Sequence, residues 1–144
     1  MNQAESSSKQ KAENEPTMQL RALVVDDSRS MRAILRRSLE QCGFEVIEAT
    51  NGKDAVERLA LIRIPDLALV DWNMPEMTGI EFVTNVRRDH SYDAMRIIMV
   101  TTETELEQMQ RALTAGANEY IMKPFTKDVL VDKLTMLGLS DGVS

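Results

Sequence analysis

The sequence predicts an α/β fold in which helices cover a parallel β-sheet. Two observations lead to this prediction: five short apolar runs alternate with five segments of helical periodicity, and four of the runs are almost wholly apolar. Strands that are covered on both faces lack the polar alternation of half-exposed strands. At 144 residues and 43% apolar content, the chain is long enough for one compact domain with an ordinary core.

The apolar runs predict the strands. The second run, Glu45-Val46-Ile47-Glu48-Ala49, alternates between polar and apolar residues, so it should lie at an edge of the sheet. The other four should be covered on both faces. The five expected strands span residues 20–25, 44–49, 66–70, 96–101 and 118–122.

Five amphipathic surface helices are expected between and after these strands. In the first, Arg32, Arg36 and Arg37 lie opposite the apolar stripe, and Gly43 ends the helix. The residues expected to face the core are Met31, Ile34, Leu35, Ser38, Leu39 and Cys42 in the first helix; Ala55, Val56, Leu59 and Ala60 in the second; Phe82, Val83 and Val86 in the third; Leu106, Met109 and Leu113 in the fourth; and Leu130, Leu134 and Leu137 in the fifth.

Charge and composition limit the function classes. The 17 basic and 23 acidic residues give a net charge of -6, which argues against a basic nucleic-acid surface. No apolar run is long enough to cross a bilayer and the amino terminus lacks the apolar core of a secretory signal, so we expect a cytoplasmic protein. The single Cys42 is interpreted as a half-buried thiol in a reducing compartment.

The chain is expected to divide into a tail and one domain. Residues 1–17 are rich in Ser, Lys, Glu and Gln and should be disordered, and the domain should span residues 18–144. The polar loop that holds His90, the single histidine, is expected to be exposed.

Polar side chains end four of the predicted strands. Since the carboxyl ends of parallel strands meet at one edge of a sheet, Asp26, Asp27, Asp71, Thr101 and Lys123 should converge. Three carboxylates held together repel one another, so either their pKa values rise or a divalent cation neutralises them. All-oxygen ligands favour Mg²⁺.

Four motifs at these strand ends carry a family resemblance. They are Val25-Asp26-Asp27-Ser28, Asp71-Trp72-Asn73-Met74-Pro75, Val100-Thr101 and Lys123-Pro124-Phe125-Thr126. In their order and spacing, the chain from Leu20 to Leu139 resembles the receiver domain of two-component response regulators, most closely the single-domain chemotaxis regulators of CheY type. The resemblance implies a flavodoxin-like, doubly wound five-stranded parallel sheet in the order 2-1-3-4-5 with five helices.

The resemblance also implies roles for the acidic residues. Asp71 resembles the phosphoacceptor, a nucleophile that becomes 4-aspartylphosphate. Asp27 and Asp71 would bind Mg²⁺ directly, Asp26 would bind it largely through water, and the backbone carbonyl of Asn73 would add a further oxygen. Asn73 and Glu103 match the fast-hydrolysing chemotaxis type, which predicts a short-lived phosphate.

The resemblance implies that the remaining site residues bind the phosphoryl group and transmit the signal. Lys123 would contact a phosphoryl oxygen, and its peptide bond to Pro124 is expected to be cis. Thr101 would donate its hydroxyl to the phosphoryl group. As Thr101 moves, Tyr120 would turn from an exposed to a buried rotamer and change the face made by the fourth helix, fifth strand and fifth helix.

The resemblance implies partners as well. A histidine kinase of CheA type would be the phosphodonor, and a flagellar switch protein or another output protein would bind the altered face. The fourth helix begins with Glu103-Thr104-Glu105-Leu106-Glu107, which is more acidic than in enteric chemotaxis proteins and weakens the assignment to the flagellar switch. Because no module follows the last helix, a monomer signalling by protein binding is expected, with no catalysis beyond its own phosphorylation and dephosphorylation.

Three alternatives remain. A phosphorelay intermediate or phosphate sink would share every site residue and differ in the surface around the first helix. A haloacid-dehalogenase-like phosphatase needs a second Asp where this chain has Asn73. A flavodoxin-like FMN carrier needs a phosphate loop rich in Ser, Thr and Gly after the first strand, where Asp26 and Asp27 would repel a bare phosphate.

Overall fold

The computed structural model describes residues 19–102 and 107–139, and their strands and helices alternate along the chain. The expected tail at 1–17 lies outside these ranges, as do Glu103 and Leu106. The elements are β2 (Arg21–Val25), α1 (Arg29–Gln41), β3 (Glu45–Ala49), α2 (Gly52–Leu59), β4 (Leu67–Asp71), α3 (Gly79–Arg87), the 3-10 helix η1 (His90–Tyr92), β5 (Arg96–Thr101), α4 (Met109–Ala115), β6 (Glu119–Met122) and α5 (Lys127–Met136).

The five described strands form one parallel sheet in the order β3-β2-β4-β5-β6. Numbered along the chain, this is the predicted order 2-1-3-4-5. The alternating strand, β3, lies at an edge as expected. The other edge strand, β6, is less covered than predicted: Ile121 is buried in one core and Tyr120 packs against the other, but Tyr120 is only half-buried and Met122 is exposed.

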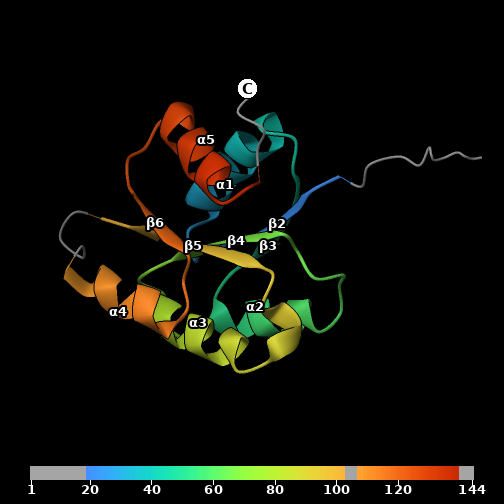
Figure 1. Ribbon diagram of the computed structural model, residues 1–144, viewed down its shortest axis with the longest axis vertical. Coiled ribbons are helices and arrows are strands. Elements are labelled where there is room, and N and C mark those ends of the chain that lie inside the picture. The colour runs from blue at the N-terminus through green and yellow to red at the C-terminus, as the bar shows by residue number, and fades with distance from the viewer. Residues whose placement is uncertain (1–18, 103–106, 140–144) are drawn as a thin grey trace, which may run out of the picture.

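Helices cover both faces of the sheet (Figure 1). α1 and α5 lie on one face, and α2, α3 and α4 lie on the other. Successive strand residues point to opposite faces, and each face therefore has its own core. Leu23, Ala68 and Ile97 pack with α2, α3 and α4, whereas their neighbours Val24, Leu69 and Ile98 pack with α1 and α5.

Polar side chains begin four of the helices. Ser28, Asn51, Thr78 and Thr126 each accept a hydrogen bond from a backbone N–H in the first turn. Thr78 and Glu81 form a reciprocal capping box at the start of α3. Two of these caps matter for the site, because Ser28 follows Asp26 and Asp27 directly, and Thr78 ends the loop after Asp71.

Three residues expected to face the core are exposed. Ile34 of α1 has an exposed fraction of 57%, and Leu113 of α4 and Ala60 are also exposed. Ala60 follows the last residue of α2, Leu59, so it has left the helical stripe. In α1 only the part of the apolar stripe centred on Leu35 and Leu39 is buried against the sheet. Leu137 likewise caps α5 rather than belonging to it.

The expected burial of Cys42 and exposure of His90 are confirmed. Cys42 caps the end of α1 and is half-buried, and burial raises the pKa of its thiol. His90 lies exposed in η1, a turn that the sequence did not predict. Over the described ranges, no helix is both long and apolar enough to pass through a membrane.

Candidate functional site

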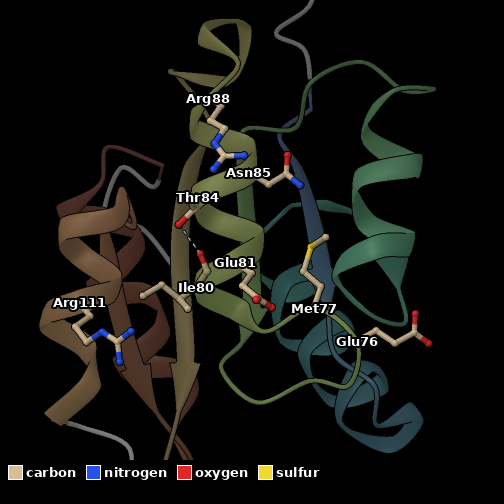
Figure 2. A pocket seen from close by; sticks show the side chains of 8 residues that line it. All are labelled: Glu76, Met77, Ile80, Glu81, Thr84, Asn85, Arg88 and Arg111. Atoms are coloured by element: carbon tan, nitrogen blue, oxygen red, sulfur yellow. Dashed lines mark hydrogen bonds between the residues drawn. The ribbon is translucent and has the colours of Figure 1, made fainter.

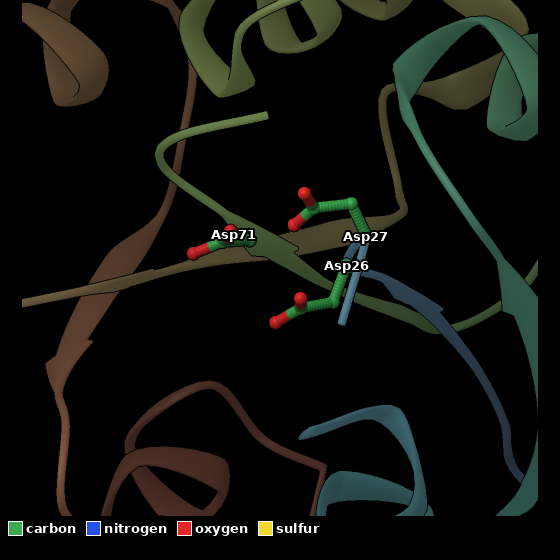
Figure 3. A group of neighbouring side chains, drawn as sticks. All are labelled: Asp26, Asp27 and Asp71. Carbon is green, nitrogen blue, oxygen red and sulfur yellow. The ribbon is translucent and has the colours of Figure 1, made fainter. Parts of the chain in front are cut away.

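Three carboxylates meet at the carboxyl edge of the sheet (Figure 3). Asp26 and Asp27 follow β2, and Asp71 is the last residue of β4, one residue beyond its predicted end. β2 and β4 are neighbours in register, with Val25 beside Val70, so their ends are level. One carboxylate oxygen from each aspartate lies within 4.8 Å of the other two. The structure therefore brings these residues together as the strand-end argument expects.

The three carboxylates differ in burial. The exposed fraction is 1% for Asp26 and 8% for Asp71, whereas Asp27 is exposed. Burial raises the pKa of Asp71 to about 6, with a further contribution from the charge of Asp26 that Lys123 partly offsets. Burial also raises the pKa of Asp26. Two buried carboxylates therefore resist ionisation together unless a cation joins them.

The hydrogen bonds of Asp26 fit a cation at this position. Its Oδ1 accepts a hydrogen bond of 2.8 Å from the backbone N–H of Ser28. Its Oδ2 is buried and has no hydrogen-bond partner among the residues described by the structure. A buried carboxylate oxygen without a donor is costly, and a divalent cation would satisfy it. Three convergent carboxylates are hard oxygen donors, which suit Mg²⁺.

Lys123 completes the charge balance of the site. Its Nζ donates to Asp71 Oδ1 at 3.3 Å, and its backbone N–H donates to the carbonyl of Thr101 at 2.7 Å. The peptide bond between Lys123 and Pro124 is cis. Thr101 ends β5 and is buried, and its hydroxyl donates to the carbonyl of Thr102 at 3.2 Å. Thr101 thus lies at the end of β5, the strand next to β4, and Lys123 follows β6, the strand beyond β5.

The other expected site residues lie around this centre. Asn73 is exposed in the loop after β4, two residues beyond Asp71. Tyr120 in β6 is half-buried and packs against the core under α4. Its ring centroid lies 5.1 Å from Lys133 Nζ, and Lys133 is paired with Glu119 at 3.0 Å. Tyr120 is therefore held between the core and a surface ion pair.

Sequence reasoning missed one contact of the site. Arg32 was placed on the outer, polar side of the first helix, but its side chain is only 12% exposed and donates to the backbone carbonyl of Asp26 at 2.7 Å. The signal in the sequence was its spacing. Between Asp27 and α1 lies only Ser28, and Arg32 is in the first turn of the helix, which is close enough for a long side chain to reach back.

A separate hollow of about 500 Å³ lies between α3, α4 and the loop that precedes α3 (Figure 2). Arg88 and Arg111 line it together with Glu76 and Glu81, so its charges oppose one another. None of the three clustered aspartates lines it. The chemistry expected from the sequence is therefore at the strand ends and not in this hollow.

Comparisons with known proteins point to one family. The model of the response regulator receiver domain matches residues 22–135. The chain is 44% identical over 124 residues to chemotaxis protein CheY1 of Helicobacter pylori, covering 85% of this chain and 100% of that protein. It is 45% identical over 125 residues to a chemotaxis protein CheY homolog of Campylobacter jejuni, covering 85% and 96%. Among solved structures, chemotaxis response regulator CheY4 of Vibrio cholerae matches with a TM-score of 0.76 and 37% identity, over 83% of this chain and 99% of that one.

Proposed function

The chain belongs to the response regulator receiver domain family, and from this premise we propose that it is a chemotaxis-type response regulator phosphorylated on Asp71 by a histidine kinase. It signals by protein binding in chemotaxis or flagellar motility. Its catalysis is limited to its own phosphorylation and dephosphorylation.

One observation carries the assignment of Asp71. Asp71 forms an ion pair with the Lys123 ammonium at 3.3 Å, and one carboxylate oxygen of Asp26 and one of Asp27 lie within 4.8 Å of it. A nucleophile that accepts a phosphoryl group needs cationic groups around the incoming oxygens. Asp71 is therefore close both to the Lys123 ammonium and to the two carboxylates with which it could hold Mg²⁺.

The reaction follows from this placement. The pKa of about 6 leaves the Asp71 carboxylate mostly ionised at neutral pH. One Asp71 oxygen attacks phosphorus in line, so that an O–P bond forms while the bond from phosphorus to the donor nitrogen or oxygen breaks and the donor keeps the electron pair. Lys123 Nζ moves from Asp71 to a phosphoryl oxygen and holds it. Water later attacks phosphorus, the bond from phosphorus to the Asp71 oxygen breaks with its electron pair on that oxygen, and inorganic phosphate and the free carboxylate result.

The residues that would hold Mg²⁺ are Asp26, Asp27, Asp71 and the backbone carbonyl of Asn73. When bound, the cation neutralises charge on the transferred group. Burial of Asp26 and Asp71 makes this neutralisation stronger than at an exposed cluster, because the local dielectric is lower.

The signal is proposed to pass through Thr101 and Tyr120. The Thr101 hydroxyl exchanges its backbone acceptor for a phosphoryl oxygen, and the ring of Tyr120 turns inward into the space that Thr101 leaves. α4, β6 and α5 form the face that a partner reads. The apolar side chains of Leu113 in α4, Met122 in β6 and Val129 in α5 are exposed. Exposed apolar residues support binding of a protein partner with an apolar contact surface, such as the flagellar switch protein.

A second candidate function rests on a different surface. An apolar hollow of about 450 Å³ lies beside Lys123, between α1 and the loop after β6. Met31, Ile34, Pro124 and Phe125 line it. A helix of a histidine phosphotransfer protein would fit there with its histidine near Asp71, which would make the chain a phosphorelay intermediate or a phosphate sink.

The deciding experiment uses Trp72, the single tryptophan, which adjoins Asp71. Its fluorescence is followed while Mg²⁺ is titrated, and then while acetyl phosphate or beryllofluoride is added. We expect a saturable Mg²⁺ response and a further change with either compound, and acetyl phosphate should also add the mass of one phosphoryl group. Asp71→Asn should lose the second change.

A native chain that gains no mass from acetyl phosphate would contradict the proposed function. The second candidate is separated by mixing the phosphorylated chain with a histidine phosphotransfer protein. Rapid return of the phosphoryl group to histidine would favour the relay, and Ile34→Glu should then slow it. Binding of the phosphorylated chain to a flagellar switch peptide, lost in Tyr120→Ala, would favour the output role.

A further inference from the structure

Arg32 reaches from the first turn of α1 to the main chain of the loop that holds Asp26 and Asp27. Its Nη1 donates to the carbonyl oxygen of Asp26 at 2.7 Å, and its Nε donates to Glu48 Oε1 at 3.0 Å. Glu48 belongs to β3, the strand next to β2. A guanidinium fork can make both contacts at once, which an ammonium cannot do in the same geometry.

The contact lies at a decisive point of the loop. The carbonyl of Asp26 is part of the planar peptide unit that joins Asp26 to Asp27, so holding this oxygen also fixes the orientation in which the Asp27 backbone begins. The backbone N–H of Asp26 donates to the carbonyl of Ala49 in β3 at 3.2 Å. Asp26 is therefore clamped between β3 and α1.

Asp27 depends on this clamp more than Asp26 does. The Asp26 carboxylate is fixed by burial and by the N–H of Ser28. The Asp27 carboxylate is exposed and makes no hydrogen bond within the described part of the chain. The direction of this side chain therefore depends on the conformation of its own backbone. Groups that orient metal ligands from outside the ligand shell change metal affinity without touching the metal.

We propose that Arg32 is a positioning residue for Mg²⁺ binding, which holds the peptide between Asp26 and Asp27 so that both carboxylates face Asp71. The proposal rests on the proposed function, because that function places Mg²⁺ at these carboxylates. Glu48 anchors the guanidinium and transmits the rigidity of β3 to the loop.

Arg36 provides a matched control. It lies one helical turn further along α1 and binds the other oxygen of the same Glu48 at 2.6 Å. Its remaining donors bind Val46 O and Glu40, and it makes no contact with the loop in the described structure. Arg32→Ala and Arg36→Ala thus each remove one arginine from Glu48, but only Arg32→Ala releases the Asp26 carbonyl.

The sign of the effect separates positioning from electrostatics. Removing a positive charge near a cation site strengthens cation binding by Coulomb's law. Loss of a positioning contact weakens it. For Arg32→Ala we expect Mg²⁺ affinity to fall by about tenfold, the lower end of the range for groups outside the ligand shell. Arg36→Ala should change it by less than about twofold, since it leaves the ligand shell intact.

The experiment titrates MgCl₂ at constant ionic strength into the native chain, Arg32→Ala, Arg36→Ala and Arg32→Lys, with Trp72 fluorescence as the readout. Thermal unfolding in EDTA measures the structural effect of each substitution apart from Mg²⁺. Arg32→Lys keeps the positive charge but loses the guanidinium that makes both hydrogen bonds at once, so it should also weaken Mg²⁺ binding. This variant tests the proposal even if Arg32→Ala does not fold.

The outcomes test the positioning role of Arg32 and the proposed function separately. Weaker Mg²⁺ binding in both Arg32 variants, beyond that in Arg36→Ala, supports the positioning role. Equal or tighter binding in the Arg32 variants, or an equal loss in Arg36→Ala, overturns it and leaves the proposed function standing. A native chain without a saturable Mg²⁺ response overturns the proposed function and the positioning role with it.

Discussion

Lys123 Nζ lies 3.3 Å from Asp71 Oδ1, although 52 residues separate them in the chain. The sheet order explains this distance: β5 lies between β4 and β6, and the lysine side chain passes over the end of β5 to reach Asp71. The resulting pair is mostly buried, with exposed fractions of 23% for the Lys123 side chain and 10% for that of Asp71.

Replacing Lys123 by Met should therefore slow phosphorylation. The substitution removes the cation that lowers the pKa of Asp71 and that would hold a phosphoryl oxygen. The rate of phosphorylation by acetyl phosphate at saturating Mg²⁺ should fall by about 100-fold, the scale of losing one preorganised donor. Intact mass spectrometry at timed intervals measures this rate.

Lys133→Met is the control for this substitution. Lys133 has a similar exposed fraction, 24%, and a similar ion pair, with Glu119 at 3.0 Å. It contacts none of the three clustered aspartates in the described structure. An equal loss of rate in both variants would refute the role of Lys123.

The raised pKa of Asp71 should make Asp71→Asn more stable than the native chain at neutral pH without Mg²⁺. Its pKa is about 6 in the folded chain and 3.8 ordinarily, so between these values the folded state binds more protons and its stability falls as pH rises. Asn cannot ionise, so the unfolding free energy of Asp71→Asn does not fall in this way. The gain at pH 7.5 should be about 2 to 3 kcal/mol and should shrink to near zero at pH 4.

Urea unfolding of both proteins across this pH range measures the difference, in which the titration of groups that do not interact with Asp71 cancels. Asp132→Asn, at an exposed aspartate of α5, should show no such pH-dependent gain. If Asp71→Asn gained the same stability at pH 4 as at pH 7.5, burial of an ionised Asp71 would not be its cause.

Gly79 should not tolerate a side chain. A Cβ at Gly79 would lie 2.7 Å from the carbonyl oxygen of Asp71 and 3.2 Å from Trp72 Cα, which are backbone atoms and cannot turn away. Gly79→Ala should therefore cost about 1 to 3 kcal/mol of unfolding free energy, as overpacking does. Because the strand must shift at Asp71, it should also weaken Mg²⁺ binding.

Gly52→Ala is the matched control, since Gly52 likewise begins a helix. The three atoms nearest to its new Cβ all belong to the flexible side chain of Met77, the nearest being the sulfur at 2.8 Å. Urea unfolding and Mg²⁺ titration should show a smaller loss of stability and unchanged affinity. Similar effects in both variants would argue against a backbone clash at Asp71.

Replacing Glu76 by glycine should stabilise the folded chain. It has φ 68°, in the left-handed region that disfavours side chains with a Cβ, within the loop between β4 and α3. Glu76→Gly should stabilise the chain by about 0.5 to 1 kcal/mol, because glycine adopts this conformation without steric cost. Glu57→Gly, at an exposed position inside α2, should do the opposite by about 1 kcal/mol. Differential scanning calorimetry of the two variants tests the sign.

The sequence by itself determined the sheet and the edge at which its polar residues meet. Apolar periodicity is a local property, and the right-handed crossover makes the common edge follow from it. The strand order came from the family resemblance that the four motifs carry. Asp26, Asp27, Asp71, Thr101 and Lys123 could thus be placed near one another before any coordinates. The motif resemblance then named the family that the comparisons show.

Tertiary structure decided what depends on neighbours distant in sequence. Ile34 and Leu113 share the spacing of buried residues, but only the part of a helix that touches the sheet is covered. The pKa of Asp71 depends on how deeply β4 lies between its neighbours and on a lysine from another strand end. Arg32 looked like a solvent-facing charge, and only the approach of α1 to β2 and β3 showed that it holds the Asp26 carbonyl.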